Sequence, residues 1–250
     1  MLSSNQLKQI TALQHKKYRQ ESGLYVVEGR KMVLELLKSD SEIVGIYAES
    51  SWADSFADKR HNVAMTVVSS KELSRMSSLS TPDGVLAVVK QKTPSDFDAA
   101  KDLVLVLDSI NNPGNLGTII RLASWFGVKN IVCSSDTVDC YNPKTVQSTM
   151  GAVFHTNIVY AGIEEFLCKN KNLNIYGTVL NGGENIYTHS LSNDGIIIIG
   201  SESHGISKQA MAYVNNPVTV PSFSQTKDVE SLNASIACAV VLSEFRRRRY

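Results

Sequence analysis

Two continuous aliphatic runs place the strongest constraint on how this chain can fold. They are Leu103–Leu107 (LVLVL) and Ile196–Ile199 (IIII), and neither contains a polar residue. Such runs are typical of central parallel strands that are covered on both faces, whereas strands with one solvated face alternate apolar and polar residues. Ligands of open α/β sheets bind beyond the carboxyl ends of the strands. We therefore predict an α/β fold with a parallel sheet and expect functional residues directly after these two runs.

The residues before Leu103 form a second, smaller pattern. Met1–Gln20 reads as one amphipathic helix, with apolar side chains on one side and basic ones on the rest. Strands and helices then alternate, which predicts a small sheet covered by helices: strands at 24–29, 43–48, 63–68 and 85–89, and helices at 30–39 and 71–76. Gln91–Asp96 is polar, contains Pro94 and reads as a linker. We predict two domains, residues 1–95 and residues 96–250.

Strand and helix patterns also alternate in the second domain. The expected strands lie at 103–107, 130–134, 154–159, 175–180, 196–199 and 218–220, and the expected helices at 116–126, 144–150, 163–169 and 232–242. The last helix contains almost only small or apolar residues, which predicts burial nearly all round. Ser231 directly precedes it, and a serine hydroxyl in that position can accept a hydrogen bond from an unpaired backbone N–H, so Ser231 is the expected N-cap.

Composition limits the classes of partner and compartment. The formal net charge of the 250-residue chain is +1, so a surface that binds nucleic acid must be a local basic patch. The four cysteines lack the close spacing of a zinc site or a disulfide framework. We expect no metal, no membrane segment and a cytoplasmic location, since no long apolar run occurs and the cysteine usage fits a reducing compartment.

Three short blocks in the second domain carry polar and glycine residues at the ends of predicted strands. They are an Asn-x-Gly-x-x-x-Arg block, a strand that ends in Gly-x-Glu-x-x-Gly, and a strand followed by proline, a polar loop and Ser-Leu-Asn. The residues concerned are Asn115, Gly117, Arg121; Gly200, Glu202, Gly205; and Val220, Pro221, Ser231, Leu232, Asn233. In order and spacing these blocks resemble the SpoU (TrmH-like) RNA ribose 2′-O-methyltransferases of the SPOUT superfamily.

The resemblance implies an enzyme that transfers a methyl group from S-adenosylmethionine to a ribose 2′-hydroxyl in structured RNA. The segment from Tyr18 to Leu37 resembles the start of the substrate-binding domain of these enzymes, which is built like a small ribosomal protein. That domain favours ribosomal RNA over transfer RNA as the substrate, by analogy. The resemblance also implies a deep trefoil knot near the C-terminus and a homodimer formed through the knotted domain. A non-catalytic RNA-binding protein on the same fold and a flavodoxin-like nucleotide-binding module remain as alternatives.

Site residues follow from matching the blocks position by position. The resemblance implies catalytic roles for Arg121, Asn115, Glu202, Ser231 and Asn233, and cofactor contacts from Gly200, Ser201, Gly205, Val220 and Leu232. Local basic charge marks RNA-binding candidates at Lys16, Lys17, Arg19, Arg30 and Lys31. Because an arginine is effectively never deprotonated in a protein, we expect Arg121 to bind an RNA phosphate and stabilise the developing alkoxide.

Each of these assignments has a structural alternative. Arg121 could pair with Asp108, Glu202 could hold its own loop by accepting backbone N–H bonds, and His204 reads as a structural loop residue. The loop Ser222–Glu230 is longer than the family pattern and lacks its usual glycine. The basic run Arg246–Arg249 reads either as a solvated helix end or as an RNA contact.

Overall fold

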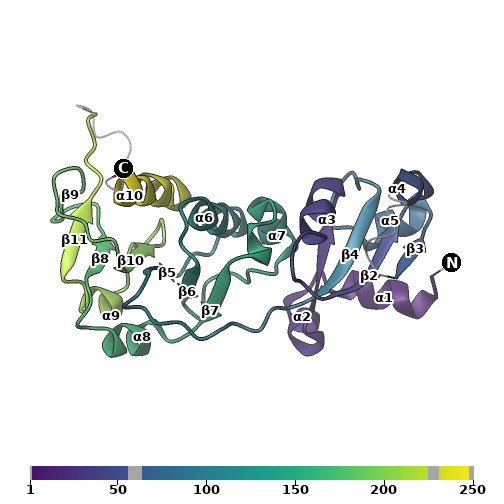
Figure 1. Cartoon of the computed structure of the whole chain (residues 1–250), viewed down its shortest axis with the longest axis horizontal. Coiled ribbons are helices and arrows are strands. Elements are labelled where there is room, and N and C mark those ends of the chain that lie inside the picture. The colour runs from purple at the N-terminus through teal and green to yellow at the C-terminus, as the bar shows by residue number, and fades with distance from the viewer. Residues whose placement is uncertain (1, 56–63, 225–230, 248–250) are drawn as a thin grey trace. The chain divides into compact units, whose positions relative to one another are not determined.

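The computed structural model describes residues 2–55, 64–224 and 231–247 (Figure 1). Contacts divide the chain into two compact units, and the division is not linear along the sequence. The first unit contains Met1–Thr93 together with Asp139–Phe154, and the second contains Pro94–Val138 together with His155–Tyr250. The contacts therefore place a segment of the predicted second domain in the first unit. The functional division at residue 95 stays a prediction.

The first unit is built on a four-stranded sheet with the order β1-β4-β2-β3. Strand β4 pairs antiparallel with β1 and with β2, and β2 pairs parallel with β3. The strands are β1 (Leu24–Glu28), β2 (Ile43–Ala48), β3 (Met65–Val67) and β4 (Val85–Lys90). The helices are α1 (Ser4–Ala12), α2 (Lys16–Ser22), α3 (Arg30–Leu36), α4 (Ser50–Ser55) and α5 (Ser70–Met76), with α7 (Pro143–Thr149) and the 3-10 turn η1 (Ala152–Phe154) added from the later segment.

The prediction of one helix over Met1–Gln20 was wrong, because the chain turns between α1 and α2. The first helix begins with a capping box in which the Ser3 hydroxyl accepts from the N–H of Gln6 and the Gln6 side chain accepts from the N–H of Ser3. Gln6 is therefore an exposed capping residue rather than part of the apolar face, which Leu7, Ile10 and Leu13 supply.

Arg19 was predicted to contact RNA, and the structure contradicts this. Its side chain is buried at 1% exposure, and its Nε and Nη2 atoms donate to Oδ2 of Asp139 at 2.9 and 2.7 Å. Its Nη1 atom donates to the carbonyl oxygens of Leu13 and Gln14, each at 2.9 Å. A buried guanidinium needs a carboxylate and filled donors, so Arg19 joins the turn after α1 to the start of the Asp139–Phe154 segment.

The second unit contains a seven-stranded sheet with the order β7-β6-β5-β10-β8-β11-β9, and every strand pair in it is parallel. The strands are β5 (Leu103–Asp108), β6 (Asn130–Cys133), β7 (Asn157–Tyr160), β8 (Ile175–Thr178), β9 (Glu184–Asn185), β10 (Gly195–Gly200) and β11 (Asn216–Thr219). The helices are α6 (Pro113–Trp125), α8 (Ile163–Lys169), α9 (Lys208–Met211) and α10 (Ala234–Arg247).

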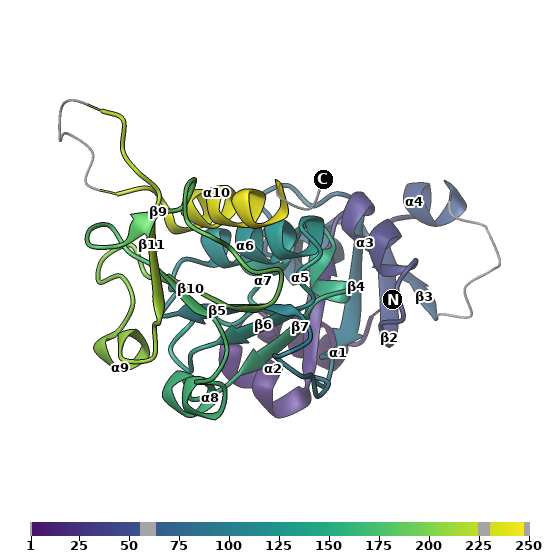
Figure 2. The same ribbon diagram turned by 60° about the vertical axis from the view of Figure 1, so that its left-hand side comes forward.

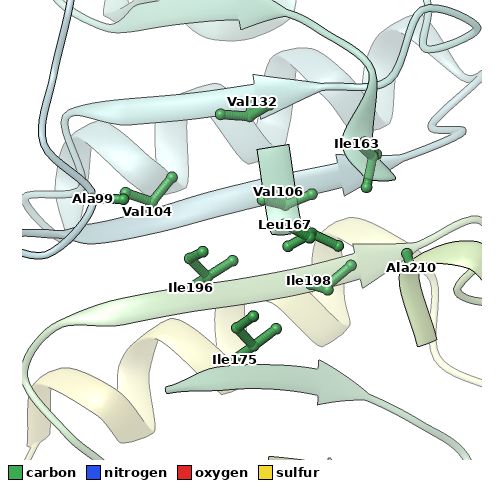
Figure 3. Packing of buried hydrophobic residues seen from close by; sticks show 10 residues of the cluster. All are labelled: Ala99, Val104, Val106, Val132, Ile163, Leu167, Ile175, Ile196, Ile198 and Ala210. Carbon is green, nitrogen blue, oxygen red and sulfur yellow. The ribbon is translucent and has the colours of Figure 1, made fainter. Parts of the chain in front are cut away.

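Both faces of the two central strands are covered, as the aliphatic runs predict. Helices α6 and α10 lie side by side on one face of the sheet, and α8 and α9 lie on the other (Figures 1 and 2). All residues of β5 and β10 are buried. Figure 3 shows Val106 and Ile198 of these strands on the same face, close to Leu167 of α8.

Helices α6 and α10 begin at positions that differ from the predicted ones. Helix α6 begins at Pro113 rather than near Leu116, because the Asn112 side chain accepts from the N–H groups of Gly114 and Asn115. Gly117 is therefore inside the helix. Helix α10 begins after Asn233, so the prediction of Ser231 as its N-cap was wrong. An asparagine or aspartate caps at least as well as serine, and sequence spacing alone does not decide between neighbouring candidates.

Helix α10 is also not buried all round. Its buried side chains recur at helical spacing, at Ala234, Ser235, Cys238, Val241, Leu242, Glu244 and Phe245. On its outer side Ile236 is 52% exposed, and Leu232 just before the helix is 44% exposed. Among the described residues, none covers this apolar outer side fully.

Two predictions lie wholly or partly outside the described residues: most of the long loop Ser222–Glu230, and the end of the basic run Arg246–Arg249. The trefoil knot stays a prediction, because part of the expected crossing segment is in that loop. In the described chain, no helix is long and apolar enough to cross a membrane.

Candidate active site

The carboxyl ends of β5 and β10 meet at one edge of the sheet. The two strands are neighbours and run parallel, with Gly200 opposite Asp108. The chain continues from β5 to β6 and β7 on one side, while β8 and β11 lie beyond β10 on the other. The order in which strands are added therefore reverses between β5 and β10, and open α/β sheets bind their ligands at such a point.

Three of the five predicted catalytic residues come together at this edge. Asn115 is in the first turn of α6, Glu202 is in the loop after β10, and Asn233 precedes α10. The side-chain amides of Asn115 and Asn233 both donate to Oε1 of Glu202, that of Asn233 at 2.8 Å. Asn233 also donates to Oδ1 of Asn115 at 3.1 Å, so the three side chains form a closed network. We call these residues the Asn–Glu–Asn cluster.

Asn233 has a second role as the N-cap of α10. Its Oδ1 atom accepts from the backbone N–H of Ser235 at 3.0 Å and from the Ser235 hydroxyl at 2.7 Å. The N–H of Ala234 donates to Glu202 at 3.4 Å. The structural alternative for Glu202 was that it holds its own loop by accepting backbone N–H bonds. Among the described residues its one backbone donor is instead Ala234, at the start of α10. Ser231 is half-buried nearby, and no hydrogen bond among the described residues joins it to the cluster.

Gly200 is required by its own loop. The N–H and C=O groups of Ser201 and Gly205 pair at 3.1 and 2.9 Å, which closes the loop back onto the end of β10. A Cβ atom on Gly200 would lie 2.1 Å from the carbonyl carbon of Gly205. The loop chain, rather than a ligand, therefore fills the space that makes glycine necessary at this position.

Arg121 does not pair with Asp108, the carboxylate named above as its structural alternative. Asp108 is 4% exposed and accepts from the backbone N–H of Ser207 at 2.7 Å. Arg121 is exposed on α6, and none of the hydrogen bonds or ion pairs in the described chain uses its guanidinium. Its planar set of donors is available to an anion.

The main chain around the third block offers further polar groups. Val220 follows β11 and Leu232 precedes α10, and within the described ranges no hydrogen bond uses the backbone of either residue. The hydrogen bonds of His204 with the described residues stay within its own loop, with Nδ1 2.8 Å from the Ser203 hydroxyl and the backbone N–H donating to the Ser201 hydroxyl at 3.2 Å. No group of three His, Cys, Asp or Glu side chains in the described residues is arranged to hold a metal ion.

The RNA-binding candidates other than Arg19 lie on the surface of the first unit. Lys16, Lys17 and Lys31 are exposed. The Nζ atom of Lys17 lies 3.9 Å from Oε1 of Glu21, which is a long ion pair. Arg30 is about half-exposed and lies 3.3 Å from Asp83. These exposed cations remain available to phosphate groups, since exposed ion pairs are weak.

Comparison with known proteins assigns both parts of the chain. The SpoU rRNA Methylase family matches residues 102–243, more than half of the sequence. The chain belongs to the SpoU rRNA methylase family. The MRM3-like substrate binding domain matches residues 4–87. The predicted family and fold class are therefore confirmed, and the Asn–Glu–Asn cluster lies within the SpoU methylase region.

Individual relatives share the whole length of this SpoU chain. The 23S rRNA (guanosine(2553)-2′-O)-methyltransferase RlmP of Bacillus subtilis is 28% identical over 94% of this chain and 93% of its own. A Porphyromonas gingivalis protein described as a TrmH-family RNA methyltransferase has a TM-score of 0.89 and 30% identity, with 99% of each chain covered. An AdoMet-bound rRNA methyltransferase from Sinorhizobium meliloti has a TM-score of 0.87 and 26% identity over 100% of this chain and 97% of its own.

Sequence reasoning missed Asn112 as the residue that begins α6. The signal was present, because asparagine before proline at the first helical position is a common helix start. It also missed Ser109, whose backbone is left-handed at φ 60°. No pattern in the sequence marks that conformation, since serine rarely adopts it.

A first prediction concerns Gly200. Alanine at this position should force the Ser201–Gly205 loop away from β10, because the new Cβ atom would overlap backbone that cannot rotate aside. We expect the dissociation constant for S-adenosylmethionine to rise about tenfold or more, measured by calorimetric titration. Gly162→Ala is the matched control, since a Cβ there would meet nothing closer than 3.9 Å. Unchanged affinity in a folded Gly200→Ala protein would separate this loop from the cofactor site.

Proposed function

We propose that this chain methylates a ribose 2′-hydroxyl in ribosomal RNA, with S-adenosylmethionine as methyl donor. The observation that carries the proposal is the Asn–Glu–Asn cluster at the carboxyl edge of β5 and β10, in a chain of the SpoU rRNA methylase family. Relatives that match nearly the full length are named as rRNA methyltransferases, one of them a 2′-O-methyltransferase and one AdoMet-bound.

The residues at this edge fit S-adenosylmethionine. The main-chain groups of Val220 and Leu232, which make no hydrogen bond within the described ranges, flank the loop between β11 and α10, and the closed loop Gly200–Gly205 ends strand β10. Backbone donors and acceptors of this kind can hold the polar groups of a nucleoside, while the exposed Leu232 side chain offers apolar contact. When bound, S-adenosylmethionine supplies a methyl group on a positively charged sulfur. The sulfur is already activated as the leaving group.

The chain's own contribution is then position and charge. The Asn–Glu–Asn cluster fixes three segments to one another, namely the start of α6, the loop after β10 and the start of α10. Orientation of two reactants is a large part of the rate acceleration when no difficult bond activation is needed. Arg121 binds the phosphate next to the reacting ribose and stabilises the negative charge that develops on the 2′-oxygen as its proton passes to solvent water.

RNA capture is assigned to the first unit, whose residues 4–87 match a substrate-binding domain. We expect Lys16→Glu with Lys17→Glu to weaken RNA binding about tenfold or more at low salt, and to flatten its salt dependence, because each lost phosphate contact removes one released counterion. Filter binding over a range of salt concentrations measures both effects. Lys101→Glu with Lys171→Glu is the control, since both are exposed lysines of the second unit and the double change alters the net charge equally. Equal losses in both proteins would show that total charge, rather than the first unit, determines affinity.

We also propose a homodimer formed through the second unit and a cytoplasmic location. The support for the dimer is the apolar outer side of α10 and the neighbouring helix α6, where Ile236 is 52% and Trp125 is 83% exposed. Analytical ultracentrifugation of the wild-type chain and of Ile236→Glu tests it.

Mapping of 2′-O-methyl positions tests the proposed reaction. RNA from cells with and without the protein is compared, and the purified chain is then supplied with S-adenosylmethionine and unmethylated ribosomal RNA. One lost ribosomal position that the purified protein restores supports the proposal. A lost position in transfer RNA would change the substrate, and cofactor binding without any methylation would favour a non-catalytic RNA-binding protein.

A further inference from the structure

The backbone between β5 and α6 contains a conformation that side chains rarely adopt. Ser109 directly follows β5 and has φ 60°, one of two non-glycine residues with positive φ in the described chain. A left-handed backbone is unfavourable for residues with a Cβ atom and persists only where the surroundings hold it. The residue lies three positions before Asn112, the N-cap of α6, and six before Asn115 of the Asn–Glu–Asn cluster.

Neighbouring side chains hold Ser109 from the segment after β6. Its N–H donates to the Ser134 hydroxyl at 2.9 Å, and its own hydroxyl donates to Oδ2 of Asp136 at 2.6 Å. The next residue is held in the same way, since the N–H of Ile110 donates to the Thr137 hydroxyl at 3.2 Å. Its carbonyl oxygen accepts from the N–H of Val138 at 2.9 Å.

Two carboxylates among the described residues lie near the Ser109 hydroxyl. Asp136 accepts from it at 2.6 Å, and Oδ1 of the adjacent Asp108 lies 3.4 Å away. The hydroxyl of Ser109, followed by that of Ser134, lowers the pKa of Asp136, so the carboxylate is charged at neutral pH and accepts strongly. Asp136 itself is exposed, so its contribution to the fold of this region comes through the hydroxyl groups of Ser109 and Ser134.

We propose that Asp136 is a positioning residue for methyl transfer, acting through the Ser109 hydroxyl to hold the backbone that places Asn112 at the start of α6 and Asn115 in the Asn–Glu–Asn cluster. This inference rests on the proposed function, because the cluster is the site it serves. Asp136 touches neither substrate nor cofactor. If the restraint is lost, Ser109 returns to an ordinary backbone conformation for part of the time, and the start of α6 is misplaced during that time.

Glycine at position 109 separates this role from a general structural one. Glycine adopts positive φ without penalty, so the Asp136 contact becomes unnecessary in a Ser109→Gly chain. Alanine at 109 keeps the penalty and loses the hydroxyl, so it should mimic loss of Asp136. Asp136→Asn keeps an acceptor oxygen and should retain most of the restraint.

The experiment measures kcat and KM for RNA methylation in the variants Asp136→Ala, Asp136→Asn, Ser109→Ala and Ser109→Gly, and in the doubles Ser109→Ala/Asp136→Ala and Ser109→Gly/Asp136→Ala. We expect Asp136→Ala and Ser109→Ala each to lower kcat about tenfold with little change in KM, and their double to be no worse than either. Ser109→Gly/Asp136→Ala should have kcat within about threefold of Ser109→Gly. Asp98→Ala is the control, since the Asp98 carboxylate also accepts a hydrogen bond, in its case from the N–H of Ala100, but precedes the amino end of β5.

A second readout does not depend on activity. Amide hydrogen exchange of Ile110 and Asn115 should be faster in Asp136→Ala and return toward its original rate in the Ser109→Gly double. If the wild-type chain fails to methylate RNA while exchange changes as described, the proposed function fails and the restraint stands. If Asp136→Ala leaves exchange and kcat unchanged, or if Ser109→Gly does not rescue it, the restraint is overturned.

Discussion

Replacement of Arg121 by lysine should lower kcat for RNA methylation about a hundredfold, because lysine keeps the positive charge but loses the planar set of donors. The magnitude corresponds to removal of one preorganised donor to a developing oxyanion. Single-turnover methylation with saturating S-adenosylmethionine measures the effect on chemistry apart from product release.

The fold and the cofactor site should be unaffected by this change. Arg121 is exposed and makes no hydrogen bond or ion pair with the part of the chain that the structure describes. The melting temperature of the Arg121→Lys protein and its affinity for S-adenosylmethionine therefore serve as internal controls. Arg247→Lys is the matched control, because it makes the same substitution on the last turn of α10. There the guanidinium binds Glu244 through two donors at 2.9 and 2.7 Å. A lysine at 121 with normal turnover would remove this side chain from the reaction.

The second large effect concerns stability. Arg19→Ala should lower the free energy of unfolding of the first unit by about 3–5 kcal/mol, because it leaves Asp139 without its partner in a largely buried place and the carbonyl groups of Leu13 and Gln14 without a donor. Urea denaturation followed by circular dichroism measures the loss.

Two further variants keep that result interpretable. Arg19→Met with Asp139→Leu removes both charges and should recover part of the lost stability, since breaking one half of a buried pair costs more than replacing the pair. Lys17→Ala is the exposed control. Weaker RNA binding by Arg19→Ala at unchanged stability would restore Arg19 as an RNA contact.

The difference between Arg19 and its neighbours shows what the sequence alone could not predict, namely which basic side chain is buried. Lys16, Lys17 and Arg19 look alike in a basic helix, and only the fold brings Asp139, 120 positions away, against one of them. The same limit applies to Ile236, because an apolar helix gives no sign of which side remains uncovered. Strands were easier to predict, since the burial of β5 and β10 on both faces leaves a continuous aliphatic run in the sequence.

The Asn–Glu–Asn cluster was partly predictable from the sequence. Its members were named because their spacing matches a family pattern, and their contact is a property of the fold, since Asn115 and Glu202 are 87 positions apart. What spacing could not supply was the function of each side chain. Asn233 caps α10 and also binds Glu202. Both roles depend on the backbone geometry before α10, which a sequence motif does not contain.

The passage of Asp139–Phe154 into the first unit has a consequence for the order in which the protein is made. A ribosome that has synthesised residues 1–93 has delivered the whole sheet of that unit, but neither the carboxylate for Arg19 nor the buried side chains of Val146 and Phe154. Completion of the first unit must wait until residue 154 has left the exit tunnel, when β5, α6 and β6 of the second unit have already emerged. We therefore expect the first unit to be completed only after part of the second unit has emerged, and a chain that ends at residue 93 would lack the Asp139–Phe154 segment of the first unit.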